Sequence, residues 1–171
     1  MAILAAADSG QEVAAVVALE HHGRFDGGGY PGTVGNREQH LFSRLVTAVD
    51  VFDAITTRRS YRRAETPHQA INVLRQGAGT QFDPDIVKAL VGLVGEYPPG
   101  SLLRLDDTRV ALVTRRRRNQ APEVVLVVTS DGTVLDVPEP VELSAHTIVE
   151  EILPDIAGVD PASLIEQVAS L

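Results

Sequence analysis

A proline and glycine break at Tyr97-Pro98-Pro99-Gly100 divides the chain into two stretches with different hydrophobic patterns. Before the break, apolar residues recur every three or four positions, which predicts helices. From Ser101 to about Val141, short β-branched runs alternate with turn residues, which predicts a small antiparallel meander. The sequence therefore predicts an α+β protein, with an all-α helical bundle portion over residues 1–96 and a β-rich module with a closing helix over residues 97–171.

Two of the expected helices begin with local capping signals. Thr66 stands as a cap before Pro67 at the first helical position, and Gln69 completes a capping box. Asp83-Pro84 opens the next helix in the same way. Two more helices are expected over residues 11–22 and 41–58, and the apolar stripe of the second predicts a long buried helix.

Turn residues set the expected strands of the second half. Asp106-Asp107-Thr108, residues 115–122 and Ser130-Asp131-Gly132 separate the β-branched runs. The strands are expected over residues 102–105, 110–114, 124–129 and 133–137. A closing helix is expected after Asp160-Pro161.

Composition restricts the kinds of site that the chain can hold. There is no cysteine in the 171 residues, so any metal must be bound by imidazole and carboxylate groups. The net charge of -8 argues against a long nucleic acid polymer as partner, although a small anionic substrate stays possible. No apolar run approaches the roughly 18 residues of a membrane span, and the chain is expected to be cytoplasmic.

The histidine pair His21-His22 is the clearest candidate for metal chemistry. It ends a helical stretch, is followed by a glycine-rich segment, and precedes Asp50 on the helix expected over residues 41–58. Imidazole binds borderline divalent metals, and a carboxylate adds an oxygen ligand. The alternative is a pair of histidines that hydrogen-bond the last carbonyls of a helix.

Four arginines, Arg58, Arg59, Arg62 and Arg63, gather within six residues of this acidic chain. Guanidinium groups bind phosphate in a fork and stack on bases, which favours an anionic substrate. The alternative is a solvated helix end at which the arginines offset the dipole. The run from Arg115 to Arg118 is expected to mark a solvated hairpin tip.

Four motifs together resemble the second half of an HD-GYP domain, a bacterial signal-transduction family of metal-dependent phosphodiesterases that hydrolyse cyclic di-GMP. The resemblance covers about residues 10–95. The motifs are His21-His22 through Gly29-Tyr30-Pro31, Asp50-Val51-Phe52-Asp53-Ala54-Ile55-Thr56, Arg59-Ser60-Tyr61-Arg62, and Gly79-Thr80-Gln81-Phe82-Asp83-Pro84.

The resemblance implies a role for each matched position. His21, His22 and Asp50 match metal ligands, and the implied cofactor is a divalent transition metal, iron or manganese. Residues at the implied substrate-binding site for cyclic di-GMP are Gly29, Tyr30, Arg59 and Arg62.

The family's His-Asp dipeptide does not occur in these 171 residues. The resemblance places it and further ligands upstream of residue 1, so this chain alone is expected to have little or no hydrolase activity. Two alternatives are a non-catalytic module that binds a diguanylate cyclase, or a sensor or receiver domain, through the GYP loop, and a phosphohydrolase of the wider HD superfamily.

Overall fold

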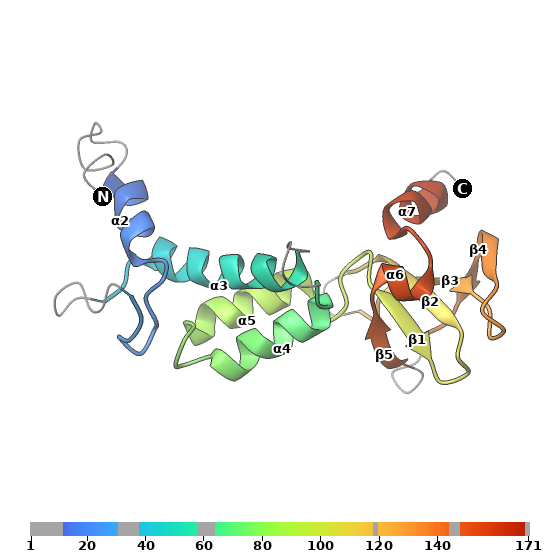
Figure 1. Cartoon of the computed structure of the whole chain (residues 1–171), viewed down its shortest axis with the longest axis horizontal. Helices are drawn as coiled ribbons and strands as arrows, with labels where there is room; N and C mark the ends of the chain where they lie inside the picture. Colours follow the sequence, from blue (N-terminus) through green and yellow to red (C-terminus); the bar gives the residue numbers. More distant parts are fainter. Residues whose placement is uncertain (1–11, 31–37, 58–63, 118–119, 144–147, 170–171) are drawn as a thin grey trace.

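The structure is a computed structural model that describes residues 12–30, 38–57, 64–117, 120–143 and 148–169. Within these ranges it contains six helices and one five-stranded antiparallel sheet, which confirms the predicted α+β class. We call residues 12–96 the helical part and residues 97–169 the sheet part. The two parts lie at opposite ends of an elongated molecule (Figure 1). Their definition as two domains stays a prediction.

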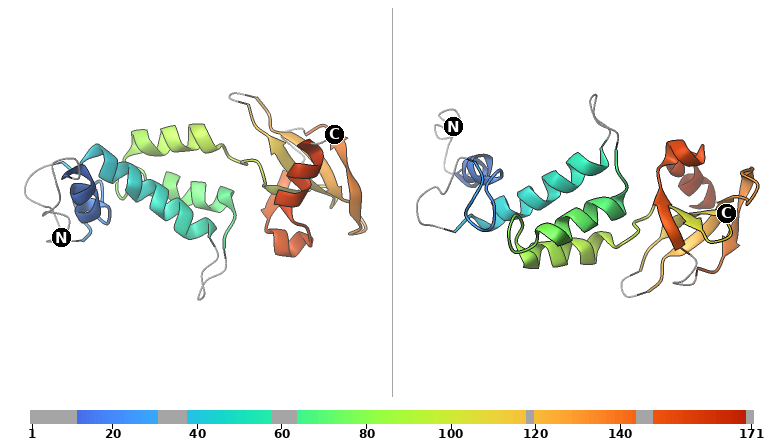
Figure 2. Two further views of the ribbon diagram at one scale, coloured as in Figure 1. Left: turned by 90° about the horizontal axis from the view of Figure 1, so that it is seen from above. Right: turned by 60° about the horizontal axis from the view of Figure 1, so that its bottom comes forward.

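The described residues of the helical part form four helices. They are α2 (Glu12–Glu20), α3 (Leu41–Thr56), α4 (Pro67–Gly77) and α5 (Pro84–Val94). A core of Ala48, Leu74, Phe82, Ile86 and Val87 fills the space between α3, α4 and α5. Figure 2 shows α4 and α5 as an antiparallel pair beside α3, with α2 at the far end. Among the described residues, no helix is long and apolar enough to cross a membrane.

Both predicted capping signals are confirmed. The Thr66 hydroxyl accepts a hydrogen bond from the Gln69 backbone N–H, and the Gln69 side chain accepts one from the Thr66 N–H. The Asp83 carboxylate accepts hydrogen bonds from the N–H groups of Asp85 and Ile86. These caps satisfy donors that have no partner within a helix, so α4 and α5 begin where the sequence predicts.

The prediction that the apolar stripe of residues 41–58 is buried is wrong for one face of α3. Ala48 and Ile55 are buried, but Leu41, Leu45 and Val49 are 56%, 43% and 45% exposed. The reason is that α4 and α5 pack against the side of α3 that carries Ala48, and no described element covers the other side. An apolar face of α3 is therefore open in this structure.

The sheet has the strand order β4-β3-β2-β1-β5. The four predicted strands are confirmed as β1 (Leu102–Leu105), β2 (Val110–Arg115), β3 (Glu123–Val128) and β4 (Val134–Val141). A fifth strand that the sequence analysis missed, β5 (Ile148–Ile152), pairs with the outer edge of β1. Two short helices follow, α6 (Pro154–Ala157) and the predicted closing helix α7 (Pro161–Ala169).

Each face of the sheet has its own apolar cluster. On one face, Leu102, Leu112 and Val127 pack against Leu164 and Ile165 of α7. The other face carries a second buried cluster, against which Tyr97, the residue that leads out of the helical part, is packed. The Tyr97 ring also stacks on the ring of His68 in α4, so the two parts of the molecule are in direct contact.

Candidate metal centre

His21 and His22 lie directly after the last residue of α2, with their ring centroids 3.9 Å apart. The Nδ1 atom of His21 lies 3.1 Å from the carbonyl oxygen of Val17. A carbonyl oxygen only accepts hydrogen bonds, so this contact requires the hydrogen of the His21 ring on Nδ1. In the neutral form of this ring, Nε2 carries the lone pair, and this form binds a metal ion. The same bond also fits the capping alternative, but it occupies only one ring nitrogen.

Reciprocal hydrogen bonds hold the end of α2 against the start of α3. The buried carboxylate of Glu20 accepts from the backbone N–H of His40 at 2.8 Å and from the hydroxyl of Ser43 at 2.9 Å. In return, the Thr47 hydroxyl lies 2.8 Å from the backbone carbonyl oxygen of His21. Each helix thus provides a hydrogen-bond partner for a backbone group at the end of the other, the His40 N–H before α3 and the His21 carbonyl after α2. The histidine pair is fixed relative to α3.

Asp50 follows Thr47 by three residues on α3 and is exposed. This spacing puts Asp50 about one helical turn beyond the bond that joins Thr47 to His21. However, the described part of the chain holds no group of three or more His, Cys, Asp or Glu side chains placed to bind a metal ion. The structure brings His21 and His22 together and leaves Asp50 apart from them. The pair fits two nitrogen ligands of a metal, and the complete ligand set stays a prediction.

The glycine-rich segment after the histidines forms a closed loop. Gly23 and Gly29 form an antiparallel bridge, and the Arg24 N–H donates to the carbonyl oxygen of Gly28 at 2.9 Å. Gly29 has φ +88, and a Cβ atom there would lie 2.6 Å from the carbonyl oxygen of His22. Only glycine satisfies both conditions. Tyr30, at the end of the loop, is 78% exposed.

An ion pair stiffens this loop. The Arg24 guanidinium bonds the Asp26 carboxylate with an Nη2 to Oδ2 distance of 3.0 Å. The hydrogen bond from Arg24, with a further one from the Gly28 N–H, holds the pKa of Asp26 below its ordinary value. Asp26 is therefore a carboxylate at neutral pH, and both of its partners lie within the loop.

The loop is docked on the turn between α4 and α5. The N–H groups of Phe25 and Asp26 donate to the carbonyl oxygens of Gln81 and Thr80 at 3.1 and 2.9 Å. These bonds join the His-His motif to the Gly-Thr-Gln-Phe-Asp-Pro motif, although the two lie more than 50 residues apart in the sequence. The predicted motifs at residues 21–30 and 79–84 form one connected structure.

Arg44 ties α3 to the same turn, and the sequence analysis missed it. Its Nη1 atom lies 2.8 Å from the Oδ2 atom of Asp83, and its guanidinium carbon lies 6.0 Å from the centre of the Phe25 ring. Glu20 was missed as well. Both residues bond partners distant in sequence. Glu20 is buried and Arg44 is half-buried, and charged side chains in such positions usually have a partner. The predicted substrate residues Arg59 and Arg62 lie outside the described residues.

Comparison with known proteins identifies this part of the chain. The family model described as the HD domain matches residues 2–86. Residues 2–86 are thus similar to the HD domain family. The HD domain match includes His21, His22, the glycine loop, α3, α4 and the start of α5. It does not extend to the sheet part.

Three similar curated proteins show the range of relatives of this HD domain. A cyclic di-GMP phosphodiesterase of Pseudomonas aeruginosa is 39% identical over 97 residues, which cover 57% of this chain and 23% of that protein. A cyclic di-GMP phosphodiesterase response regulator of Xanthomonas campestris is 41% identical over 80 residues, 47% of this chain and 21% of that protein. A 3'3'-cGAMP-specific phosphodiesterase of Vibrio cholerae is 37% identical over 70 residues, 41% of this chain and 15% of that protein. The chain spans less than a quarter of the length of these three relatives.

Proposed function

We propose that residues 2–86 are part of a metal-dependent phosphodiesterase that hydrolyses cyclic di-GMP. The observation that carries the proposal is the His21 ring, whose Nδ1 atom bonds the Val17 carbonyl and leaves Nε2 for a metal ion. Support comes from relatives named as cyclic di-GMP phosphodiesterases, with 39% and 41% identity over the matched residues. Second-messenger hydrolysis in signal transduction would be the role of the whole protein.

In this proposal His21 and His22 supply nitrogen ligands and Asp50 supplies an oxygen ligand to iron or manganese. A divalent metal supplies a nucleophilic water and offsets negative charge at phosphorus. The residues of this chain hold the ring of His21 in the correct tautomer and fix the pair against α3 through Glu20. Tyr30 and Gly29 then border the substrate, since they close the loop that begins next to the histidines.

Arg59 and Arg62 complete the proposed substrate site. They follow the C-terminal end of α3, whereas the histidines are held at its N-terminal half. A cyclic dinucleotide with two phosphates and two bases offers separate contacts for arginine and for metal.

We further propose that the site needs residues from outside this chain. Three ligands from His21, His22 and Asp50 leave a dinuclear centre incomplete. The open face of α3, with Leu41, Leu45 and Val49, provides an apolar surface that additional helices of a longer protein would cover. This chain alone would then have little or no hydrolase activity.

Two other functions are supported by specific observations. The similarity to a 3'3'-cGAMP-specific phosphodiesterase favours a different cyclic dinucleotide as substrate. The 78% exposure of Tyr30 favours a non-catalytic module that binds a protein such as a diguanylate cyclase through this loop. In the second case the loop would bind its partner without metal.

Hydrolysis by the gene product extended upstream of Met1 tests these functions. We expect manganese- or iron-dependent cleavage of cyclic di-GMP, and loss of at least 100-fold in rate for Asp50→Asn. Asp53→Asn is the matched control, because Asp53 lies one turn further along the same helix, and it should retain the rate. Cleavage of 3'3'-cGAMP without cleavage of cyclic di-GMP would mean that 3'3'-cGAMP is the substrate. Equal rates for the two variants, or no cleavage together with capture of a diguanylate cyclase that Tyr30→Ala abolishes, would contradict the enzyme proposal.

A further inference from the structure

The helical part and the sheet part meet at the open end of the α4–α5 pair. These helices are antiparallel, so the start of α4 and the end of α5 lie at the same end of the pair (Figure 1). Helix ends carry backbone groups without partners inside the helix, with donors at the start and acceptors at the end. The sheet part places a charged side chain at each of these two ends.

Glu151 of β5 binds the start of α4. Its Oε2 atom lies 2.8 Å from the backbone nitrogen of His68, the second residue of that helix. A carboxylate at a helix N-terminus both accepts a free N–H and interacts favourably with the helix dipole. The His68 ring also stacks on the Tyr97 ring, with centroids 5.0 Å apart and planes inclined by 15°. The first turn of α4 is thus held by two groups outside the helix.

Arg116, just after β2, binds the end of α5. Its Nη1 atom lies 3.2 Å from the carbonyl oxygens of both Gly92 and Leu93. A cation at a helix C-terminus matches the sign of the dipole. Gly95, the C-cap residue with φ +86, has no side chain where the Arg116 side chain passes, and a Cβ atom there would collide with it. The sequence at the end of α5 therefore leaves room for this arginine.

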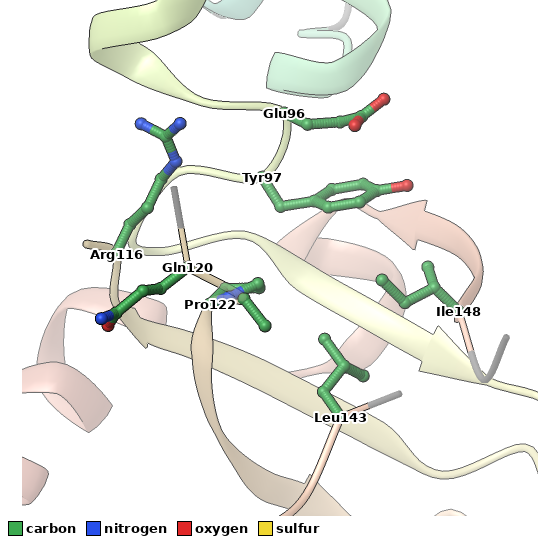
Figure 3. Close-up of a pocket in the computed structure, with 8 residues that line it drawn as sticks. Glu96, Tyr97, Arg116, Gln120, Pro122, Leu143 and Ile148 are labelled. Carbon is green, nitrogen blue, oxygen red and sulfur yellow. The ribbon is translucent and has the colours of Figure 1, made fainter. Parts of the chain in front are cut away.

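The side chains at the junction provide further contacts with α4 and α5. A cavity of about 470 Å³ lies beside this junction, with Tyr97, Pro122, Leu143 and Ile148 among its lining residues. In Figure 3 the heads of Arg116 and Glu96 extend away from these apolar groups and toward the helices. Glu96 lies 3.4 Å from Arg75 of α4. Glu96 and Arg116 also line this cavity, and their charged groups contact α4 and α5.

We propose that the sheet part is a two-point clamp on the α4–α5 pair, with Glu151 at the start of α4 and Arg116 at the end of α5. The clamp does not depend on phosphodiesterase chemistry. The opposite end of the α4–α5 pair carries the turn on which the glycine loop is docked. The sheet part therefore stabilises the same two helices that support the glycine loop. Both parts then unfold in one transition.

Hydrogen exchange of single backbone amides tests the clamp in the intact chain. Glu151→Ala removes the acceptor of the His68 N–H, so exchange of that amide should accelerate about tenfold or more. Glu150→Ala is the matched control on the same strand, because Glu150 forms an exposed pair with Arg104. We expect that Glu150→Ala leaves the His68 amide within about twofold of its original rate.

A matched pair of variants tests the contact of Arg116 with the end of α5. Arg116→Ala should accelerate exchange in the last turn of α5, whereas Arg117→Ala, which removes an exposed pair with Glu123, should not. The double variant Glu151→Ala with Arg116→Ala should separate thermal unfolding into two transitions. The clamp is contradicted if Glu151→Ala and Glu150→Ala give the same rate at His68, or if the double variant still unfolds in one transition. If Glu151→Ala fails to fold, the comparison of Arg116→Ala with Arg117→Ala decides.

Discussion

At the scale of single residues, the missing side chain of Gly29 determines how close the loop can approach His22. Its φ of +88 is unfavourable for other residues, and a Cβ atom would lie 2.6 Å from the His22 carbonyl oxygen. An added methyl group would thus push the loop away from the histidine pair. The position of His22 depends on a residue that has no side chain of its own.

We predict that Gly29→Ala lowers the free energy of unfolding by about 1–3 kcal/mol, through backbone strain and the contact with His22. Urea denaturation followed by circular dichroism measures the change. Gly92→Ala is the control, because Gly92 lies inside α5 and a Cβ atom there meets nothing within 4 Å. The control should stabilise the chain by about 0.5–1 kcal/mol. Equal effects of the two substitutions would refute this account of Gly29.

At the scale of secondary structure elements, Asp83 joins two functions in one side chain. It caps the start of α5, and it forms an ion pair with Arg44 of α3 at 2.8 Å, where its side chain is only 9% exposed. A buried carboxylate with these partners links the packing of α3 to the start of α5. Loss of Asp83 also leaves the Arg44 guanidinium without this partner in a partly buried position.

We predict that Asp83→Ala destabilises the chain by about 2–3 kcal/mol, the sum of a lost cap and a broken pair. Asp85→Ala, in the same helical turn but exposed, should cost less than about 1 kcal/mol. The midpoint of urea denaturation measures both. The double variant Arg44→Ala with Asp83→Ala should lose less than the sum of the single variants, because the two side chains interact. Strict additivity would mean that the pair contributes nothing.

The elements that the sequence predicts correctly are those with local signals. Thr66-Pro67 and Asp83-Pro84 are short local signals that determine where α4 and α5 start, and both starts are confirmed. Strand β5 was missed because its pattern, Ile-Val-Glu-Glu-Ile, does not alternate, and its stability comes from pairing with β1 more than 40 residues earlier. The Glu20 and Arg44 contacts were missed for the same reason, since their partners lie 20 to 39 residues away.

At the scale of the whole molecule, the α4–α5 pair connects the sheet part to the glycine loop. Its open end contacts Glu151 and Arg116, and its closed turn receives hydrogen bonds from Phe25 and Asp26. The open face of α3 includes Val49, and the predicted ligand Asp50 is the next residue along the helix and is exposed. We infer that a partner segment that covers this face would also close the candidate metal centre.

We propose that the histidine pair, together with Asp50, binds a divalent metal ion. Nuclear magnetic resonance with added Mn²⁺ tests it directly, because the paramagnetic ion broadens signals of groups close to it. We predict that the ring signals of His21 and His22 and the carboxyl signal of Asp50 broaden at lower Mn²⁺ concentrations than those of His68 and His146. The substitution His22→Ala should remove this preference. Equal broadening of all five histidines would contradict the assignment of this metal centre.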